Sequence, residues 1–193
     1  MRKLDVFNQI SLDGYFTDTH GDMSWAHREG DRPDPEWDEF GNQNASGGGV
    51  LLFGRVTYEL MAGFWPTPAA FEVQPVIAKQ MNALPKIVFS HTLDKVTWEN
   101  TTLISNGIED EVRRLKAEDG PDMVIMGSGT IVAQMARADL IDSYQFVVVP
   151  IVLGAGRTLF EGIEDRFEME RTNTRAFANG NVVVTYRPMA RAR

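Results

Sequence analysis

The sequence predicts an α/β fold in which helices flank a mostly parallel sheet and an antiparallel hairpin completes one edge. Three observations support this prediction. Short apolar runs rich in β-formers recur along the chain, helix-like stretches separate them, and residues 167–188 contain no helical pattern. The chain has 193 residues, of which 43% are hydrophobic, so we expect one domain over residues 1–193.

Six apolar runs are the expected strands. They cover residues 4–10, 50–53, 86–89, 123–126, 144–153 and 182–186. Several are solid hydrophobic blocks without polar alternation, which is typical of strands buried on both faces of a parallel sheet.

Helices are expected between these strands. Apolar residues repeat at helical spacing over residues 75–83 and 130–138. Asn106 could cap another helix, because apolar residues repeat among the charges that follow it. Further helices are expected to start after Gly54 and near Pro35.

Two connections are informative. Residues 178–181, Ala-Asn-Gly-Asn, form a strong tight-turn signal and predict the hairpin. The polar stretch from Thr17 to Pro35 is too long for a tight connection, so we expect a mobile functional loop there.

Charge and composition exclude several classes of function. The net charge of -8 would repel nucleic acid and anionic lipid, so neither is an expected partner. The absence of cysteine excludes disulfides, thiolate zinc sites and cysteine nucleophiles. The three histidines show no metal-ligand spacing, so no metal is expected. Without an apolar leader or a run of ~20 apolar residues, a cytoplasmic location is expected.

A glycine turn follows the expected strand at 50–53. Gly54 ends that strand, and a helix-like run begins with Arg55 and Thr57. Ligands gather at the carboxyl ends of parallel strands, where a helix N-terminus offers unpaired N–H groups to an anion. The planar fork of Arg55 matches phosphate oxygens, and Thr57 adds a donor. Taken alone, a Gly-Arg pair is better explained as a surface turn.

A second glycine turn follows the strand at 123–126. Gly127 and Gly129 would let the backbone approach a pyrophosphate closely, although the third glycine of the dinucleotide fingerprint is missing. Two such turns, each after a buried strand, together predict a phosphate site. An arginine in place of the ribose-binding acid favours NADP over NAD.

Five stretches, taken in order, resemble the dihydrofolate-reductase-like superfamily. Within it they are most similar to the reductase domain at the C-terminus of bifunctional riboflavin-biosynthesis deaminase-reductases, in its stand-alone bacterial form. The stretches are ISLDGYF at 10–16, LLFGRVTYELM at 51–61, KIVFS at 86–90, VIMGSGTIVAQM at 124–135 and LIDSYQFVVVPIVLGAGRTLFEG at 140–162. The resemblance implies a three-layer α/β/α fold, NADPH as cofactor, and hydride transfer to a C=N or C=O group of a nitrogen heterocycle.

The resemblance also implies site residues. Those for the cofactor are Gln9 and Phe16 at the nicotinamide ring, Gly54, Arg55 and Thr57 at the 2′-phosphate and pyrophosphate, Ser90 at the adenine ribose, and Gly127, Ser128, Gly129, Thr130 and Ile131 at the pyrophosphate and nicotinamide side. Dihydrofolate reductases have a cis glycine-glycine peptide at this second turn. We expect cis geometry at Gly127–Ser128, although a non-proline cis bond costs about 2.5–4 kcal/mol.

On the substrate side, the resemblance implies the 150–156 stretch, with Pro150, Leu153 and Gly154 at its rim. Trp25, in the long loop, could stack on the substrate and exclude water, or could equally anchor the loop onto the core.

Reduction also needs a proton, delivered as the hydride arrives. The candidate carboxylates are Asp13 in the first turn, Glu36 and Asp38 at the start of the first helix, and Glu161. A structural role is the simpler interpretation of each: an Asp-Gly turn, acids in the first turn of a helix, and a solvated loop glutamate.

Three functional hypotheses follow. The leading one is an NADPH-dependent oxidoreductase acting on a pteridine, such as dihydrofolate, or on the ribosylaminopyrimidine of riboflavin biosynthesis. The alternative is a non-catalytic nucleotide- or pterin-binding protein that keeps the fold. The third is an NAD-type Rossmann dehydrogenase using residues 127–129 alone. A homodimer is also expected, from the resemblance and from apolar strand surfaces near 144–153.

Overall fold

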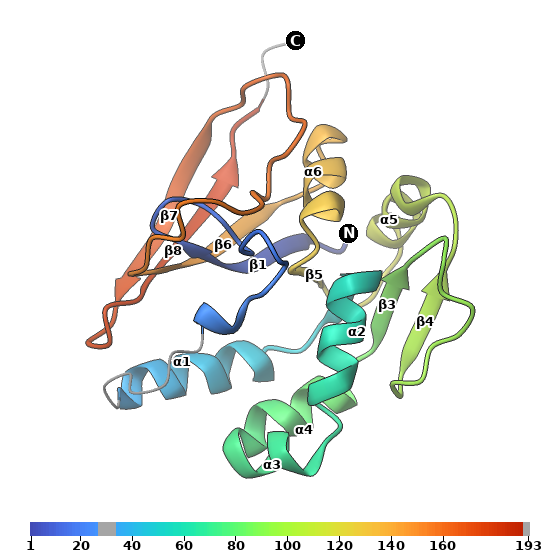
Figure 1. Ribbon diagram of the computed structural model, residues 1–193. Coiled ribbons are helices and arrows are strands. Elements are labelled where there is room, and N and C mark those ends of the chain that lie inside the picture. The colour runs from blue at the N-terminus through green and yellow to red at the C-terminus, as the bar shows by residue number, and fades with distance from the viewer. Residues whose placement is uncertain (27–33, 191–193) are drawn as a thin grey trace.

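The fold is built on an eight-stranded sheet with helices on both faces (Figure 1). It is seen in a computed structural model, which describes residues 1–26 and 34–190. Helices α5 and α6 cover one face of the sheet, and α1 to α4 lie on the other (Figure 1). The expected three-layer α/β/α class with a mostly parallel sheet is confirmed.

The strands are arranged in the order β4-β3-β2-β5-β1-β6-β8-β7. Their bounds are Leu4–Ser11 (β1), Val50–Gly54 (β2), Lys86–Phe89 (β3), Thr101–Ile104 (β4), Met123–Met126 (β5), Ser143–Val149 (β6), Met169–Ala176 (β7) and Val182–Pro188 (β8). Strands β4 through β6 in this order are parallel, so their carboxyl ends meet at one edge. Strands β8 and β7 complete the sheet as an antiparallel hairpin.

The helices alternate with the parallel strands. Their bounds are Ser24–Ala26 (η1, a 3-10 helix), Pro35–Ser46 (α1), Arg55–Phe64 (α2), Pro68–Val73 (α3), Pro75–Ala83 (α4), Ile108–Ala117 (α5) and Gly129–Arg137 (α6). Strand β5, which leads into α6, lies between β2 and β1, and this order differs from that of a classical Rossmann sheet.

Several details differ from the expectations. Strand β4 and helix α3 were not predicted, and β6 ends at Val149 because Pro150 cannot donate to the sheet. Gly107, in the left-handed conformation at φ 67°, takes the N-cap position of α5 expected for Asn106. The expected cis bond at Gly127–Ser128 is wrong: residues 1–26 and 34–190 contain no cis peptide, and both residues are left-handed, at φ 58° and 57°.

The two faces of the sheet are packed differently. On β1, Leu4 and Val6 join the large core beneath α5 and α6, whereas Phe7 contacts a small cluster beside α1. Helix α6 has six buried residues, while none of the residues of α1 is buried. Helix α1 contacts the sheet through the partly buried Trp37 and Phe40 and is otherwise loosely covered. In the described part of the chain, no helix combines the length and the apolar character needed to cross a bilayer.

Candidate functional site

The two glycine turns lie against each other at the carboxyl edge of the sheet. The Gly54 N–H donates to the Ser128 hydroxyl at 2.8 Å, and the Ser128 N–H donates to the Thr57 hydroxyl at 3.1 Å. The Ser128 and Thr57 hydroxyl oxygens are 3.0 Å apart. These contacts confirm that the turns after β2 and β5 meet, and they bring the N-termini of α2 and α6 together.

Glycine is required in the second turn for steric reasons. A Cβ atom on Gly127 would lie 2.8 Å from the Thr57 side chain, and one on Gly129 would lie 2.7 Å from the ring of Phe16. Both separations are shorter than van der Waals contact. A larger residue at either position would push the turn away from its neighbours.

A groove of about 500 Å³ runs along these two helix N-termini. Most of the cofactor residues implied by the resemblance line it, namely Phe16, Gly54, Arg55, Thr57, Ser90, Ser128, Gly129, Thr130 and Ile131. Their role in binding a cofactor stays a prediction. The structure places them in one continuous cavity.

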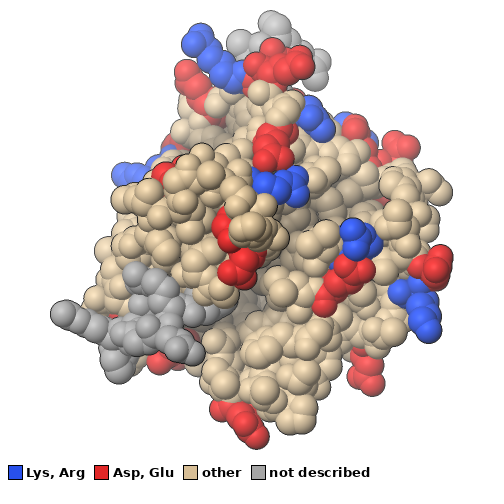
Figure 2. Space-filling view, in the orientation of Figure 1, with Lys and Arg blue, Asp and Glu red and all other residues tan. Residues whose placement is uncertain are grey.

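Two arginines line this groove from different segments, Arg55 at the start of α2 and Arg157 in the loop after β6. Arg55 pairs with Glu59 at 2.8 Å and Arg157 with Glu161 at 3.1 Å, and all four side chains are partly exposed. A guanidinium has five N–H donors, so each pair leaves donors for an anion. Lys and Arg side chains on this face of the molecule mostly lie beside acidic ones (Figure 2).

The far end of the groove, near β3 and β4, has a mixed character. Ser90, His91, Glu109 and Asp110 line it. The Ser90 hydroxyl accepts hydrogen bonds from the N–H groups of Thr92 and Leu93, at 3.1 and 3.0 Å. Ser90 therefore organises the turn after β3 as well as facing the cavity.

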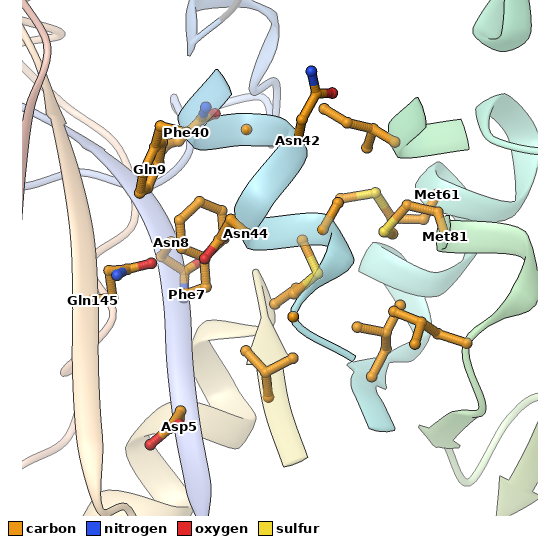
Figure 3. A pocket seen from close by; sticks show the side chains of 18 of the residues that line it. Asp5, Phe7, Asn8, Gln9, Phe40, Asn42, Asn44, Met61, Met81 and Gln145 are labelled. Atoms are coloured by element: carbon orange, nitrogen blue, oxygen red, sulfur yellow. The ribbon is translucent and has the colours of Figure 1, made fainter. Parts of the chain in front are cut away.

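A second cavity, which we call the chamber, has a volume of about 680 Å³ and lies between α1 and the sheet (Figure 3). Phe7 and Gln9 on β1 form part of its floor, and Phe40 on α1 faces them. Gln9 and Gly127, both predicted to border the cofactor, line the chamber rather than the groove. Met23 lines both cavities, so they adjoin at the loop after β1.

Three of the candidate carboxylates are engaged in structural contacts. Asp13 accepts from the Ser11 hydroxyl at 2.7 Å and from the Leu153 and Gly154 N–H groups at 3.1 and 2.8 Å. The Ser11 bond and these backbone bonds hold the pKa of Asp13 below its usual value. Glu36 pairs with Arg175 and Glu161 with Arg157, both at 3.1 Å. Asp38 is the candidate that lines the chamber.

None of the residues predicted for the substrate side lines the chamber. Trp25 packs on the aromatic cluster beside Phe7, and its ring N–H donates to the Asp22 carbonyl at 3.1 Å. Pro150 packs against the hairpin turn at Gly180. Leu153 and Gly154 are held by Asp13, as described above. Of the predicted functional loop, residues 27–33 lie outside the described residues.

Sequence reasoning missed several residues of both cavities. Arg157 follows Gly156 as Arg55 follows Gly54, so the argument made for the first Gly-Arg pair applies to it as well. Asp5 and Gln145 line the chamber, and each is a polar residue within a mainly apolar run. Asn44 lines the chamber from a polar stretch of α1, where nothing in the sequence distinguishes it.

Comparison with known proteins shows which family has this architecture. A family model, the RibD C-terminal domain, matches residues 2–183. The uncharacterized protein YyaP of Bacillus subtilis (strain 168) is 27% identical over 185 residues, which cover 96% of this chain and 94% of YyaP.

Two solved structures share the fold. One is a candidate riboflavin biosynthesis protein from Shewanella sp. PV-4, with a TM-score of 0.72, 22% identity, and coverage of 97% of this chain and 99% of that chain. The other is dihydrofolate reductase from Enterococcus faecalis complexed with NADP(H) and RAB-propyl, with a TM-score of 0.62, 17% identity and 96% coverage of both chains. The match of the family model over nearly the whole sequence is decisive, and the chain belongs to the RibD C-terminal domain family.

Proposed function

We propose that this protein is an NADPH-dependent oxidoreductase that reduces a small nitrogen heterocycle. One observation carries the proposal: the N-termini of α2 and α6 and two arginines face a single groove, and this groove adjoins a separate chamber at Met23. Such an arrangement suits a phosphorylated dinucleotide in one cavity and its reaction partner in the other.

The groove fits a dinucleotide by its construction. The first N–H groups of α2 and α6 have no partner within their own helices, and both helix dipoles favour an anion at this place. Gly129 leaves the backbone bare where a Cβ would strike Phe16, so a pyrophosphate can approach the start of α6. Arg55 would hold the 2′-phosphate and Arg157 would add charge on the pyrophosphate side.

The chamber has the character of a heterocycle site. Phe7, Trp37 and Phe40 give it flat aromatic walls, and Gln9 and Gln145 supply amide donors and acceptors. NADPH, when bound, supplies the hydride. Asp38, at the rim of the chamber, would hold the proton that the reduced atom receives.

The relatives support this proposal at the level of family and cofactor class. The Enterococcus faecalis structure with the same fold is described as a complex with NADP(H). The Shewanella sp. PV-4 structure with the same fold is described as a candidate riboflavin biosynthesis protein. Dihydrofolate and the ribosylaminopyrimidine of riboflavin synthesis are therefore the first substrates to test.

The cofactor assignment is tested by titrating NADPH and NADH into Arg55→Gln. The control is Arg113→Gln, which removes an arginine in the same i, i+4 pairing with a glutamate on α5. Because a hydrogen bond to a charged group contributes about 1.5–3 kcal/mol, Arg55→Gln should weaken NADPH binding about 10-fold or more and leave NADH unchanged. Equal effects of the two variants on NADPH would contradict the assignment.

Catalysis is tested by NADPH oxidation with a panel of pteridines and aminopyrimidines, using the unmodified protein and Asp38→Asn. Turnover that falls at least tenfold in Asp38→Asn, with KM little changed, supports the role of Asp38. Tight NADPH binding without turnover on any compound would instead favour the non-catalytic binding protein.

The homodimer stays a prediction, and within the apolar stretch near 144–153 Val152 is exposed. Val147 and Val149 of the apolar strand are buried inside the chain, because β6 lies between β1 and β8. Light scattering measures the state directly: a dimer has twice the 21.6 kDa mass of the chain.

A further inference from the structure

The chamber extends well beyond the part that adjoins the groove. It continues along β1 from Gln9 to Asp5, four residues earlier, which is about 13 Å at the usual rise of a strand. A single heterocycle placed near Gln9 would leave the Asp5 end empty. The length of the chamber therefore suits an elongated ligand.

Asp5 is the chemically distinctive group at this end. Its Oδ1 atom is buried and has no hydrogen-bond partner among the described residues. A buried carboxylate oxygen without a donor is costly, and a cation placed against this half-buried, chamber-lining carboxylate would offset part of that cost. The electrostatic surroundings also favour a positive group, since Asp122 and Asp142 stand against Lys3 and Lys116, of which Lys116 already pairs with Asp142.

The middle of the chamber is amphipathic. Gln145, two strand positions from Asp5 on the same face, and Asn44 of α1 point toward one another over Phe7 (Figure 3). Leu51, Val124 and Met126 add apolar walls from β2 and β5. This part suits an apolar body rather than a second charge.

We infer that the chamber takes an elongated ligand with an apolar body and a cationic amine head, and that the head lies at Asp5. The inference rests on the proposed function for the identification of the chamber as the substrate site, and it specifies one end of the substrate. It leaves the heterocycle end, near Gln9 and Asp38, as described above.

Three probes of matched length test this inference: phenylbutylamine, phenylbutanol and phenylbutyrate. Their affinities are measured by calorimetry and by ligand-observed NMR at neutral pH. A charge-assisted hydrogen bond in a partly desolvated site should make the amine bind about tenfold more tightly than the alcohol, with the carboxylate weakest. Magnetisation transfer from Phe7 to the bound probe would place it in the chamber.

Asp5→Asn should reduce the preference for the amine over the alcohol to within about twofold. Asp119→Asn is the matched control, because it removes the same charge at an exposed residue outside the chamber lining. Equal binding of the three probes, no binding of any of them, or an unchanged preference in Asp5→Asn overturns the inference.

A parallel NADPH titration separates this inference from the proposed function. NADPH affinity should be the same in Asp5→Asn and the unmodified protein, since Asp5 does not line the groove. Amine selectivity without NADPH binding would overturn the oxidoreductase proposal and leave a cation-binding chamber. NADPH binding without amine selectivity would overturn this inference and leave the oxidoreductase proposal standing. A chamber closed by a second copy of the chain would exclude all three probes and count against the inference.

Discussion

The groove and the chamber share Met23 but are built in opposite ways. The groove is held by short hydrogen bonds between two turns and by glycines that admit no side chain. The chamber lies beneath a helix with no buried residue and contains a carboxylate oxygen without a partner. One cavity is fixed by packing, and the other is left open at a cost in stability. Substitutions in the two should therefore have effects of different size and sign.

The largest effect is expected for Gly129→Ala. The added Cβ would lie 2.7 Å from the Phe16 ring, so either the ring or the start of α6 must move. Overpacking of this kind costs about 2–3 kcal/mol, and NADPH binding should fall by at least tenfold. Chemical denaturation and NADPH titration measure the two effects. Normal stability together with normal NADPH binding would show that the groove is less tightly built than described.

A smaller loss is expected for Thr57→Val, which keeps the shape of the side chain. It removes the hydroxyl that accepts from the Ser128 N–H and lies 3.0 Å from the Ser128 hydroxyl. A partly buried N–H left without its partner costs about 1 kcal/mol. Thr19→Val, at an exposed loop position, is the control and should leave the denaturation midpoint unchanged. Equal midpoints for the two variants would show that the contact between Thr57 and Ser128 does not stabilise the protein.

In the chamber the sign reverses, and Asp5→Asn should stabilise the protein. Burial, reinforced by Asp142 and Asp122 and opposed by Lys3 and Lys116, raises the pKa of Asp5 above its usual value. The folded state then holds the Asp5 proton more tightly than the unfolded state, so this group's contribution to stability is lost as pH rises through the folded pKa.

The Asp5→Asn variant has no carboxyl group to titrate at this position, so its stability does not fall in this way as pH rises. Its advantage should be small near pH 4, grow as pH rises, and reach about 1 kcal/mol at neutral pH, because the amide has no charge to desolvate. Denaturation curves across this pH range measure it. An advantage that does not change with pH would mean that the Asp5 charge is not the cause.

The smallest effect is expected for Gly41→Ala in α1. The new Cβ would lie 3.4 Å from Ile77, which is ordinary contact, and alanine favours a helix over glycine. A gain of about 0.5 kcal/mol is expected, against the loss for the same substitution at Gly129. Destabilisation by Gly41→Ala would show that α1 is packed more tightly than its exposure indicates.

The groove could be predicted from the sequence because its chemistry is local. A glycine after a buried strand, followed by Arg55 and Thr57 or by Ser128 and Gly129, describes both the turn and the ligand class over a few residues. The parallel sheet then brings the two turns together, since its strands all end at one edge.

The chamber could not be predicted in this way. Its lining comes from distant segments, as with Asp5, Asn44 and Gln145, and its existence depends on how far α1 stands from the sheet. Periodicity predicts which face of a helix is apolar but does not give that distance. The cis bond at Gly127–Ser128 was also mispredicted: it was inferred from the glycine-glycine pair of dihydrofolate reductases, whereas here both residues adopt the left-handed conformation.

Helix α1 is anchored at its N-terminus. Its N-terminus is fixed where Asp34 accepts from the Glu36 and Trp37 N–H groups and from the N–H of Asn179 in the β7–β8 turn. Since no residue of α1 is buried and its apolar contacts with the sheet come only from the partly buried Trp37 and Phe40, small displacements of its C-terminal half lose little apolar contact with the sheet. Its amides should exchange with solvent faster than those of α6. The separation between α1 and the sheet can then adjust to ligands of different thickness in the chamber.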